Sequence, residues 1–342
     1  MQQWNAFYEL INSDSKRFVI LTHQNPDADA IGSSLGWKLY LQKKGHNATV
    51  IVPNECPSNL RWMPDYAEVI TFDQNAQTVA QSKKLLQEAD VICCLDFNAL
   101  HRIKGLGSLA QSSEAIKILI DHHLEPESFA DFEFSDTTKA ATAQYIWEII
   151  KQMGDAELVD KPIAECLYAG IMTDTGSFRH GNTTPEVHLA VADLMRTGLN
   201  TNYVHRVIFD NNSLGRTRLL GYVLSEKLTW LPEYRTVYMT LSLEELKRFN
   251  SEIGDTDGIV NFGLSLENVV MSVLLIERRD EIKLSFRSVQ DFSVRELASK
   301  YFSGGGHKNA SGGRTSTSLP ETVNLLLSIL PEYQTQLLNV EK

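Results

Sequence analysis

Three apolar segments rich in β-branched residues constrain the fold of this chain, because each ends at side chains that can bind metal ions. They are RFVILTH (17–23), ADVICCLDF (89–97) and AIKILIDHH (115–123). Such runs are typical of buried strands. Helical patterns over 29–44 and 76–88 separate them, and this alternation predicts a mostly parallel sheet with right-handed crossovers. The carboxyl ends of the strands would then meet at one edge of the sheet.

The sequence therefore predicts an α/β protein. Two further strands, at 47–53 and in EVITF (68–72), would complete an N-terminal, mostly parallel five-stranded sheet flanked by helices. Residues 137–154 predict a helix with a threonine at its start and Gly154 at its end. The remainder predicts a smaller C-terminal α/β domain. We place the domain boundaries at 1–184 and 223–342, with a helical linker over 185–222.

Length, charge and cysteine content narrow the classes of function. A chain of 342 residues suits two domains. Its net charge of −11 disfavours a protein that grips duplex DNA through many phosphates. The four cysteines include no CxxC pair, so zinc–thiolate chemistry is not expected. We also find no membrane-length apolar run and no signal-peptide pattern, so we expect a cytoplasmic protein without a membrane partner.

Four distant segments offer ligands for hard metal ions. Each alone could be a helix cap or a turn, but the four together indicate a metal site. Burying so many carboxylates side by side requires a cation to neutralise them. Oxygen-rich sites with some imidazole favour Mn²⁺, Mg²⁺ or Co²⁺. The ligands are His23, Asp27 and Asp29 in THQNPDADAIGS, Asp96 in VICCLDFN, Asp121, His122 and His123 in IKILIDHH, and Asp174, which ends a helical pattern in GIMTDTGSF.

These segments resemble a known family. THQNPDADAIGS, CCLDFN, DHH and DTGSF resemble the four motifs of the DHH phosphoesterases, in family order. FSGGGHKNASGG resembles the glycine-rich motif of the DHH-associated C-terminal domain. The resemblance covers nearly the whole chain and is strongest to the NrnA group of stand-alone nanoRNases and pAp phosphatases. It implies a DHH catalytic, metal-binding domain over 1–184 and a DHH-associated, substrate-binding domain over 223–342.

The resemblance also implies roles for the matching residues. Two Mn²⁺ ions are expected per chain, with Mg²⁺ or Co²⁺ as alternatives, and a water between them would attack phosphorus. His123 would face the substrate phosphate, and Asp121 would orient an imidazole by accepting its other N–H. Asp96, His122 and His123 are thus the expected catalytic residues. One ion would be held by His23, Asp27 and Asp96, and the other by Asp29, Asp96, His122 and Asp174.

The C-terminal half offers a second kind of site. Gly304, Gly305 and Gly306 precede His307, and their backbone N–H groups would give an anion close access. The spacing does not match a Walker loop. The resemblance implies that this segment binds the nucleotide portion of the substrate and that Arg287, in LSFRSV, grips a phosphate. Arg314, Arg179 and His180 are basic neighbours of these motifs, with only proximity to support a role.

We therefore expect an Mn²⁺-dependent phosphoesterase that hydrolyses very short single-stranded RNA to mononucleotides and dephosphorylates 3′-phosphoadenosine-5′-phosphate (pAp). One alternative keeps the catalyst but acts on linear or cyclic dinucleotides of second-messenger turnover. A family II inorganic pyrophosphatase and a non-catalytic nucleotide-binding regulator are further alternatives. Size and acidity disfavour a RecJ-like DNA exonuclease. The sequence leaves open the cleavage polarity, the RNA or DNA preference, the metal used in the cell and whether the chain forms a homodimer.

Overall fold

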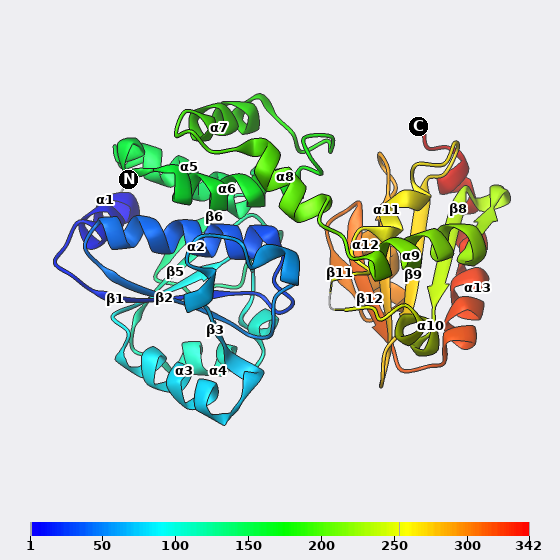
Figure 1. Ribbon diagram of the computed structural model, residues 1–342, viewed down its shortest axis with the longest axis horizontal. Coiled ribbons are helices and arrows are strands. Elements are labelled where there is room, and N and C mark those ends of the chain that lie inside the picture. The colour runs from blue at the N-terminus through cyan, green and yellow to red at the C-terminus, as the bar shows by residue number, and fades with distance from the viewer. Residues whose placement is uncertain (1, 253, 342) are drawn as a thin grey trace. The chain divides into compact units, whose positions relative to one another are not determined.

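The computed structural model describes residues 2–252 and 254–341, which form two compact units (Figure 1). The N-terminal unit is Met1–Asn211 and the C-terminal unit is Asn212–Lys342. Helices α7 (Pro185–Met195) and α8 (Thr201–Phe209) belong to the first unit, and α9 (Leu214–Tyr222) belongs to the second. The segment predicted as a linker is thus divided between the two units.

The N-terminal unit is built on a fully parallel sheet, in the order β3-β2-β1-β4-β5-β6. The predicted α/β class is confirmed, but the sheet has six strands where the sequence indicated five. The additional strand, β6, has the sequence FEFS, which contains no β-branched residue and lies at the sheet edge. The strands are β1 (Arg17–Thr22), β2 (Asn47–Val52), β3 (Ile70–Thr71), β4 (Val91–Leu95), β5 (Ile116–Asp121) and β6 (Phe132–Ser135).

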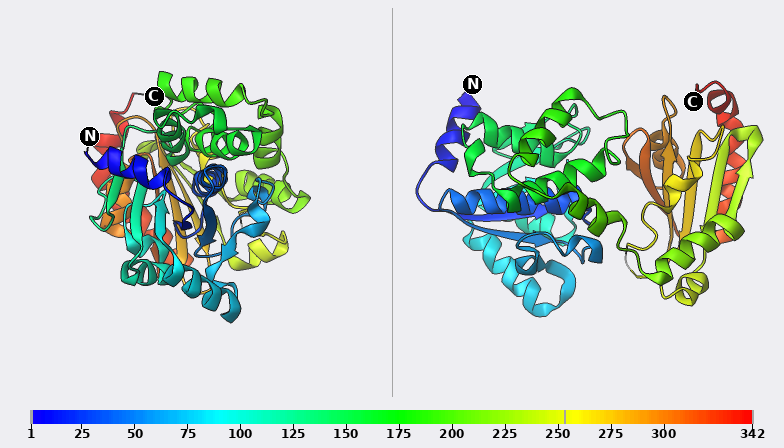
Figure 2. Two further views of the ribbon diagram at one scale, coloured as in Figure 1. Left: turned by 90° about the vertical axis from the view of Figure 1, so that its left-hand side faces the viewer. Right: turned by 45° about the horizontal axis from the view of Figure 1, so that its top comes forward.

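Alternate residues of these strands pack against helices on opposite faces of the sheet. In β1, Phe18 and Ile20 join the core formed with α1, α2, α5 and α6, whereas Val19 and Leu21 face α3 and α4. Figures 1 and 2 show these two helical layers. Both faces are buried, which explains the nearly continuous apolar runs. The helices are α1 (Gln2–Ile11), α2 (Ala28–Lys43), α3 (Ala76–Glu88), α4 (Gly105–Ser112), α5 (Thr142–Gln152) and α6 (Lys161–Asp174).

Helices α2 and α6 approach each other closely because glycines line their contact. A Cβ atom on Gly32 would lie 2.3 Å from the carbonyl oxygen of Cys166. A Cβ atom on Gly170 would lie 2.5 Å from the Oδ1 atom of Asp29. Neither position has room for a side chain, so the two helices can bring the start of α2 and the end of α6 together.

The C-terminal unit contains a mixed sheet in the order β11-β12-β10-β9-β8-β7. Strands β8 and β9 are parallel and the other neighbours are antiparallel. The segment predicted as a glycine-rich loop contains two of these strands, β11 and β12, and β7 was also not predicted. The strands are β7 (Leu228–Leu231), β8 (Thr236–Leu241), β9 (Met271–Glu277), β10 (Ile282–Ser288), β11 (Gly305–Gly306) and β12 (Ala310–Thr315).

Helices cover this second sheet unequally. One face packs Leu284 and Phe286 of β10 against α12 and α13. On the other face, residues of β8 and β9 pack against α9, α10 and α11. Within residues 2–252 and 254–341, no helix combines the length and apolar character needed to cross a bilayer. The remaining helices are α10 (Leu243–Arg248), α11 (Ile259–Gly263), α12 (Val294–Tyr301) and α13 (Leu319–Leu338).

Candidate metal centre

The carboxyl ends of three neighbouring parallel strands deliver polar side chains to one edge of the N-terminal sheet. His23 follows β1, Asp96 follows β4, and Asp121 ends β5. The register pairs Thr22 with Leu95 and Leu95 with Ile120, so these side chains leave the sheet at the same level. The structure therefore brings together the segments that the sequence analysis singled out.

The predicted ligands gather in two groups that meet at Asp96. His23 and Asp27 form one group with Asp96, and Asp29, His122 and Asp174 form the other; in each, the potential ligand atoms lie within 4.8 Å of one another. The Nε2 atom of His23 lies 3.3 Å from Oδ2 of Asp96, and Nε2 of His122 lies 3.4 Å from its Oδ1. Each oxygen of Asp96 thus faces a different group. Nε2 of His122 also lies 3.5 Å from Oδ2 of Asp174 and 3.9 Å from Oδ2 of Asp29.

Backbone carbonyls fix the orientation of two imidazoles. Nδ1 of His23 lies 2.9 Å from the carbonyl oxygen of Gln24, and Nδ1 of His122 lies 3.2 Å from that of Lys139. A carbonyl oxygen can only accept, so each Nδ1 carries the hydrogen and donates it. Each Nε2 atom is directed at the carboxylates, to which it donates while the ring is protonated, and it is left free to bind a cation when the ring is neutral with its hydrogen on Nδ1.

Asp27 has two structural partners besides His23. It is the N-cap of α2, and its Oδ1 accepts from the backbone N–H groups of Asp29 and Ala30, each at 3.0 Å. Its Oδ2 lies 3.9 Å from Nε2 of His23. Asp27 is therefore a helix cap and a potential ligand at once, with one oxygen for each purpose.

Asp29 is fully buried and accepts hydrogen bonds at the start of another helix. The N–H groups of Thr142 and Ala143, at the N-terminus of α5, donate to its two oxygens at 2.7 and 2.9 Å. The helix predicted over 137–154 begins only at Thr142, and its N-cap residue, Ala141, has no side-chain cap. Asp29, supplied by α2, takes that place. This position also suits the positive end of the helix dipole.

Thr142 belongs to the site although no motif in the sequence pointed to it. Its hydroxyl donates to Oδ1 of Asp96 at 3.0 Å, and its N–H donates to Asp29. One fully buried residue thus holds a carboxylate of each group. No local spacing could reveal this, because 113 and 46 residues separate Thr142 from its two partners.

The backbone is strained where two of the acids are held. Asp96 has φ of +65°, in the left-handed region that residues other than glycine seldom adopt. After Asp174, the last residue of α6, Gly176, Ser177 and Phe178 have φ values of 56°, 58° and 64°. Arg179 donates from Nε to the carbonyl oxygen of Gly176 at 2.8 Å, so its side chain supports this turn.

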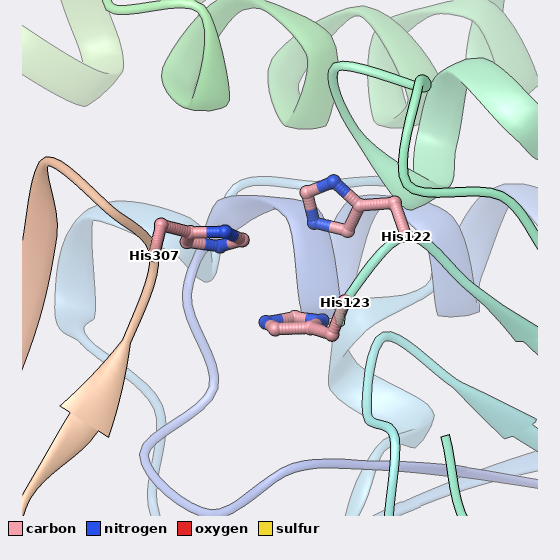
Figure 3. Close-up of side chains that lie close together, drawn as sticks. All are labelled: His122, His123 and His307. Atoms are coloured by element: carbon pink, nitrogen blue, oxygen red, sulfur yellow. The ribbon is translucent and has the colours of Figure 1, made fainter. Parts of the chain in front are cut away.

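His123 turns toward Asp121 instead of either group of ligands. Its Nδ1 lies 2.8 Å from Oδ1 of Asp121 and 3.7 Å from Oδ1 of Asp96. The rings of His122 and His123 meet edge to face, with centroids 4.8 Å apart (Figure 3). Asp121 is fully buried, and no described residue donates to its Oδ2 atom. Its Oδ1 atom is therefore the one that orients the ring of His123.

The buried carboxylates of the centre shift one another's pKa values. Burial, together with the charge of Asp96, raises the pKa of Asp29 well above its usual value. Burial and the charge of Asp29 do the same for the pKa of Asp174. Burial alone would raise the pKa of Asp96, but hydrogen bonds from His122 and His23 outweigh it and hold this pKa well below the usual range. Several of these carboxylates can be ionised together only if positive charge, from protonated imidazoles or from cations, balances them.

The same centre raises the pKa values of its imidazoles. Burial would lower the pKa of His23, but the hydrogen bond to Asp96 and the charge of Asp27 raise it to about 9. The pKa of His122 rises well above normal because Asp96 and Asp174 outweigh the effect of burial. The donor set of carboxylate oxygens and Nε2 atoms fits divalent cations. Ligand atoms about 2.1 Å from one ion lie roughly 3 Å apart, and the closest pairs found here are 3.3 and 3.4 Å apart.

The C-terminal unit holds the remaining predicted residues. A Cβ atom on Gly304 would lie 2.1 Å from the carbonyl oxygen of Gly312, and one on Gly306, where φ is +137°, would lie 2.7 Å from that of Ala310. Pairing of β11 with β12 therefore requires both glycines. A Cβ atom on Gly305 would meet nothing within 4 Å. Gly305 is thus where the backbone lies open to a ligand.

His307 and Arg287 lie at the two ends of one cross-strand row. Ala310 pairs with Arg287 in the sheet register, and the N–H of His307 donates to the carbonyl oxygen of Ala310 at 2.8 Å. Nη1 of Arg287 donates to the carbonyl oxygen of Phe286 at 2.9 Å. Figure 3 also labels His307, whose side chain is exposed. Lys308 forms an ion pair with Asp291 at 2.8 Å, so it adds little net positive charge.

Comparison with known proteins identifies relatives of both units. The chain matches the DHH family, N-terminal domain, over residues 17–171 and the DHHA1 domain over residues 237–335. It is 31% identical to the bifunctional oligoribonuclease and PAP phosphatase NrnA of Thermus thermophilus over 305 residues, 89% of this chain and 86% of the relative. It is 26% identical to the cyclic-di-AMP phosphodiesterase PdeA of Listeria monocytogenes over 336 residues, 96% of this chain and 49% of PdeA.

A solved structure extends the likeness to the whole chain. The crystal structure of an exopolyphosphatase-related protein from Bacteroides fragilis matches with a TM-score of 0.93 and 38% identity, over 98% of this chain and 97% of that one. The chain thus combines a parallel-sheet unit, whose edge gathers carboxylates and imidazoles that could hold metal ions, with a mixed-sheet unit. The chain belongs to the DHH family, with a DHHA1 domain after its DHH domain, and it is a phosphoric ester hydrolase.

Proposed function

We propose that this enzyme uses Mn²⁺ to hydrolyse very short oligoribonucleotides to mononucleotides and to dephosphorylate pAp. The similarity to the Thermus thermophilus oligoribonuclease and PAP phosphatase over most of both chains supports this substrate class. The single observation that carries the proposal is the position of Asp96 between two groups of ligands, with one oxygen toward each. A carboxylate in that position suits a pair of divalent cations.

The predicted ligands would hold the two cations in two sets that share Asp96. His23, Asp27 and Asp96 provide the first set, and Asp29, Asp96, His122 and Asp174 provide the second. When bound, paired divalent cations polarise phosphoryl oxygens and lower the pKa of water toward neutrality. The protein keeps both sets in place before substrate arrives, through the cap at α2, the start of α5 and the hydroxyl of Thr142.

His123 is assigned to the substrate phosphate. Asp121 accepts from its Nδ1 and sets the plane of the ring. Nε2 is then the nitrogen that we assign to a phosphoryl oxygen, to which it donates when the ring is protonated. His122, by contrast, has Nδ1 on a backbone carbonyl and Nε2 among three carboxylates. The two adjacent histidines therefore take different roles.

The C-terminal unit supplies recognition in this proposal. Arg287 offers a fork of donors that suits a phosphate, and Gly305, in the row of Ser285 and Gly312 on the same sheet, offers open backbone. His307 lies at the other end of the row that contains Arg287 and Ala310. Together these residues would bind the nucleotide portion of a short substrate, and the metal centre would perform the hydrolysis.

The test is an assay of the purified protein with Mn²⁺ on a labelled RNA dinucleotide and on pAp. We expect wild type to release mononucleotides from the dinucleotide and AMP from pAp. Asp96→Ala should abolish both activities, whereas Asp73→Asn, which removes an exposed carboxylate charge in the same unit, should leave them unchanged. Absence of cleavage by wild type, or full activity of Asp96→Ala, would contradict the proposal.

A second candidate function uses the same centre on dinucleotide second messengers. The similarity to PdeA, named as a cyclic-di-AMP phosphodiesterase, supports it, although this chain spans about half the length of PdeA. Turnover of linear pApA, cyclic di-AMP and pAp should be compared under the same conditions. Catalytic efficiency highest on cyclic di-AMP would favour the second function, and efficiency highest on pApA or pAp would favour the first.

A further inference from the structure

One face of β10 and β12 carries charged side chains that the core does not use. Burial alternates along β10: Ile282, Leu284 and Phe286 are buried against α12 and α13, whereas Lys283 and Arg287 lie on the opposite face, only partly covered. On that face the helices α9, α10 and α11 pack on β8 and β9. Helix α11 also approaches β10, but Gly312 and Arg314 of β12 are exposed.

Two cations stand directly opposite each other on this face. The antiparallel register pairs Lys283 of β10 with Arg314 of β12. Like charges in this arrangement destabilise a sheet. Arg314 has one distant ion pair, with Glu281 at 4.0 Å, and its side chain is largely exposed. For Lys283 the described residues offer no ion pair. An anion between the two side chains would relieve the repulsion.

Small residues separate this pair from the row of Arg287 and His307. The intervening row joins Ser285 to Gly312 and Gly312 to Gly305. A Cβ atom on Gly312 would meet only the carbonyl oxygen of Leu284, at 3.7 Å, and Gly305 is open. This part of the face therefore exposes mainly backbone, and a row with positively charged side chains lies on each side of it. At about 3.4 Å per residue, the backbone positions of Lys283 and Arg287 lie roughly 13–14 Å apart along the strand. Neighbouring phosphates are closer together than this, and the long, flexible side chains of lysine and arginine can reach toward each other to contact them.

We propose that Lys283 and Arg314 form a second phosphate site, which binds a backbone phosphate of an oligonucleotide whose neighbouring phosphate lies at Arg287. The sugar and base between the two phosphates lie over Ser285, Gly305 and Gly312. A single phosphate cannot span the two rows, so the second site acts only on substrates with an additional phosphate. This inference rests on the proposed function and specifies its substrates: it favours three or more phosphates over two.

The experiment compares substrates of increasing phosphate count. The double variant Lys283→Gln and Arg314→Gln is assayed with Mn²⁺ on pAp and pApA, which have two phosphates, and on pApApA, which has three. We expect kcat/KM on pApApA to fall by roughly 10-fold, as for loss of a charge-assisted hydrogen bond, with less than about 2-fold change on pAp and pApA. Lys247→Gln, on the exposed surface of α10, removes a charge elsewhere in the unit and should not discriminate.

Two further readouts separate this site from a general charge effect. The dependence of log kcat/KM on log salt for pApApA should become shallower by about 0.7 for each phosphate that the variant no longer neutralises. The thermal midpoint of each single variant should stay equal or rise, because the like-charge pair is relieved. Equal losses on all three substrates, or no loss on pApApA, would overturn the inference. If wild type cleaves none of the three, the proposed function itself has failed.

Discussion

The metal centre and the open face of the C-terminal sheet differ in how firmly their side chains are held. At the centre, Asp27, Asp29 and Asp96 each have several partners, and Asp29 and Asp96 are almost completely buried. On the C-terminal face, Lys283 and Arg287 are partly exposed and have few partners. Chemistry at phosphorus requires preorganised charge, whereas recognition of a flexible strand tolerates mobile side chains. The difference is consistent with the proposed roles, in which the first unit carries out the reaction and the second selects the substrate.

The sharpest test of this comparison is addition of Mn²⁺ to the metal-free protein. We expect the free energy of unfolding of the N-terminal unit to rise by about 2.7 kcal/mol when Mn²⁺ is at 100 times its Kd. Tryptophan fluorescence can follow the transition, because four of the five tryptophans lie in this unit. A chelator should reverse the shift, and Asp96→Ala should reduce it. Equal stabilisation of the C-terminal unit would contradict the expectation that the ions bind in the N-terminal unit.

The sequence could predict that these candidate site residues meet at one edge, because parallel strands impose it. Once 17–23, 89–97 and 115–123 are taken as neighbouring strands, His23, Asp96 and Asp121 must share an edge. Their distant partners could not be predicted. Asp29 caps α5, 113 residues away, and nothing near Asp29 in the sequence encodes that contact. Such contacts depend on how α2, α5 and α6 pack.

In the glycine-rich segment, the sequence failed to predict even the local secondary structure. Its composition indicated a loop, since pairing through backbone alone leaves no pattern of alternating side chains. In the structure Gly304 and Gly306 are required because β11 and β12 approach closely, and Gly305 alone is unconstrained. The sequence could not distinguish these three glycines. β6 was missed for a related reason, because FEFS lacks β-branched residues.

Variants of Thr142 test whether the hydrogen bonds that position the carboxylates matter for catalysis. Thr142→Val keeps the N–H bond to Asp29 but removes the hydroxyl from Asp96. We expect about a 10–100-fold loss of Mn²⁺ affinity or kcat, the usual effect of removing a residue that orients a ligand. Thr142→Ser restores a hydroxyl and should recover most of the activity. Equal losses in both variants would show that the hydroxyl alone does not account for the effect.

Two glycine variants test the difference between a structural and a ligand-facing position in the C-terminal unit. Gly304→Ala should destabilise this unit by on the order of 1–2 kcal/mol, because its Cβ would meet the carbonyl oxygen of Gly312. Gly305→Ala should leave stability nearly unchanged and raise KM for pAp and pApA. Urea unfolding and steady-state kinetics measure the two effects. Equal destabilisation by both variants would show that Gly305 is also structural.

The smallest expected effect is on the stability of the C-terminal unit and comes from the ionised side chain of Glu245, which pairs with Lys227. Burial would raise the pKa of Glu245, but hydrogen bonds from Lys227, the backbone of Ser242 and Tyr222 lower it from 4.5 to about 2. A lowered folded-state pKa gives stability that is present above pH 4.5 and is lost as the pH falls toward about 2. Solvent screening limits this contribution to below about 1 kcal/mol.

Glu245→Gln isolates that charge, because glutamine can keep the hydrogen bond from the backbone of Ser242 at the start of α10. We expect the variant to be slightly less stable than wild type at pH 7 and equally stable near pH 2. Urea unfolding followed through Trp230, the one tryptophan of this unit, measures the difference at each pH. A difference that stays constant with pH would mean that packing, not charge, accounts for it. In that case the ionisation of Glu245 would not contribute to the stability of the C-terminal unit, and the two units would differ further in how much their stability depends on charge.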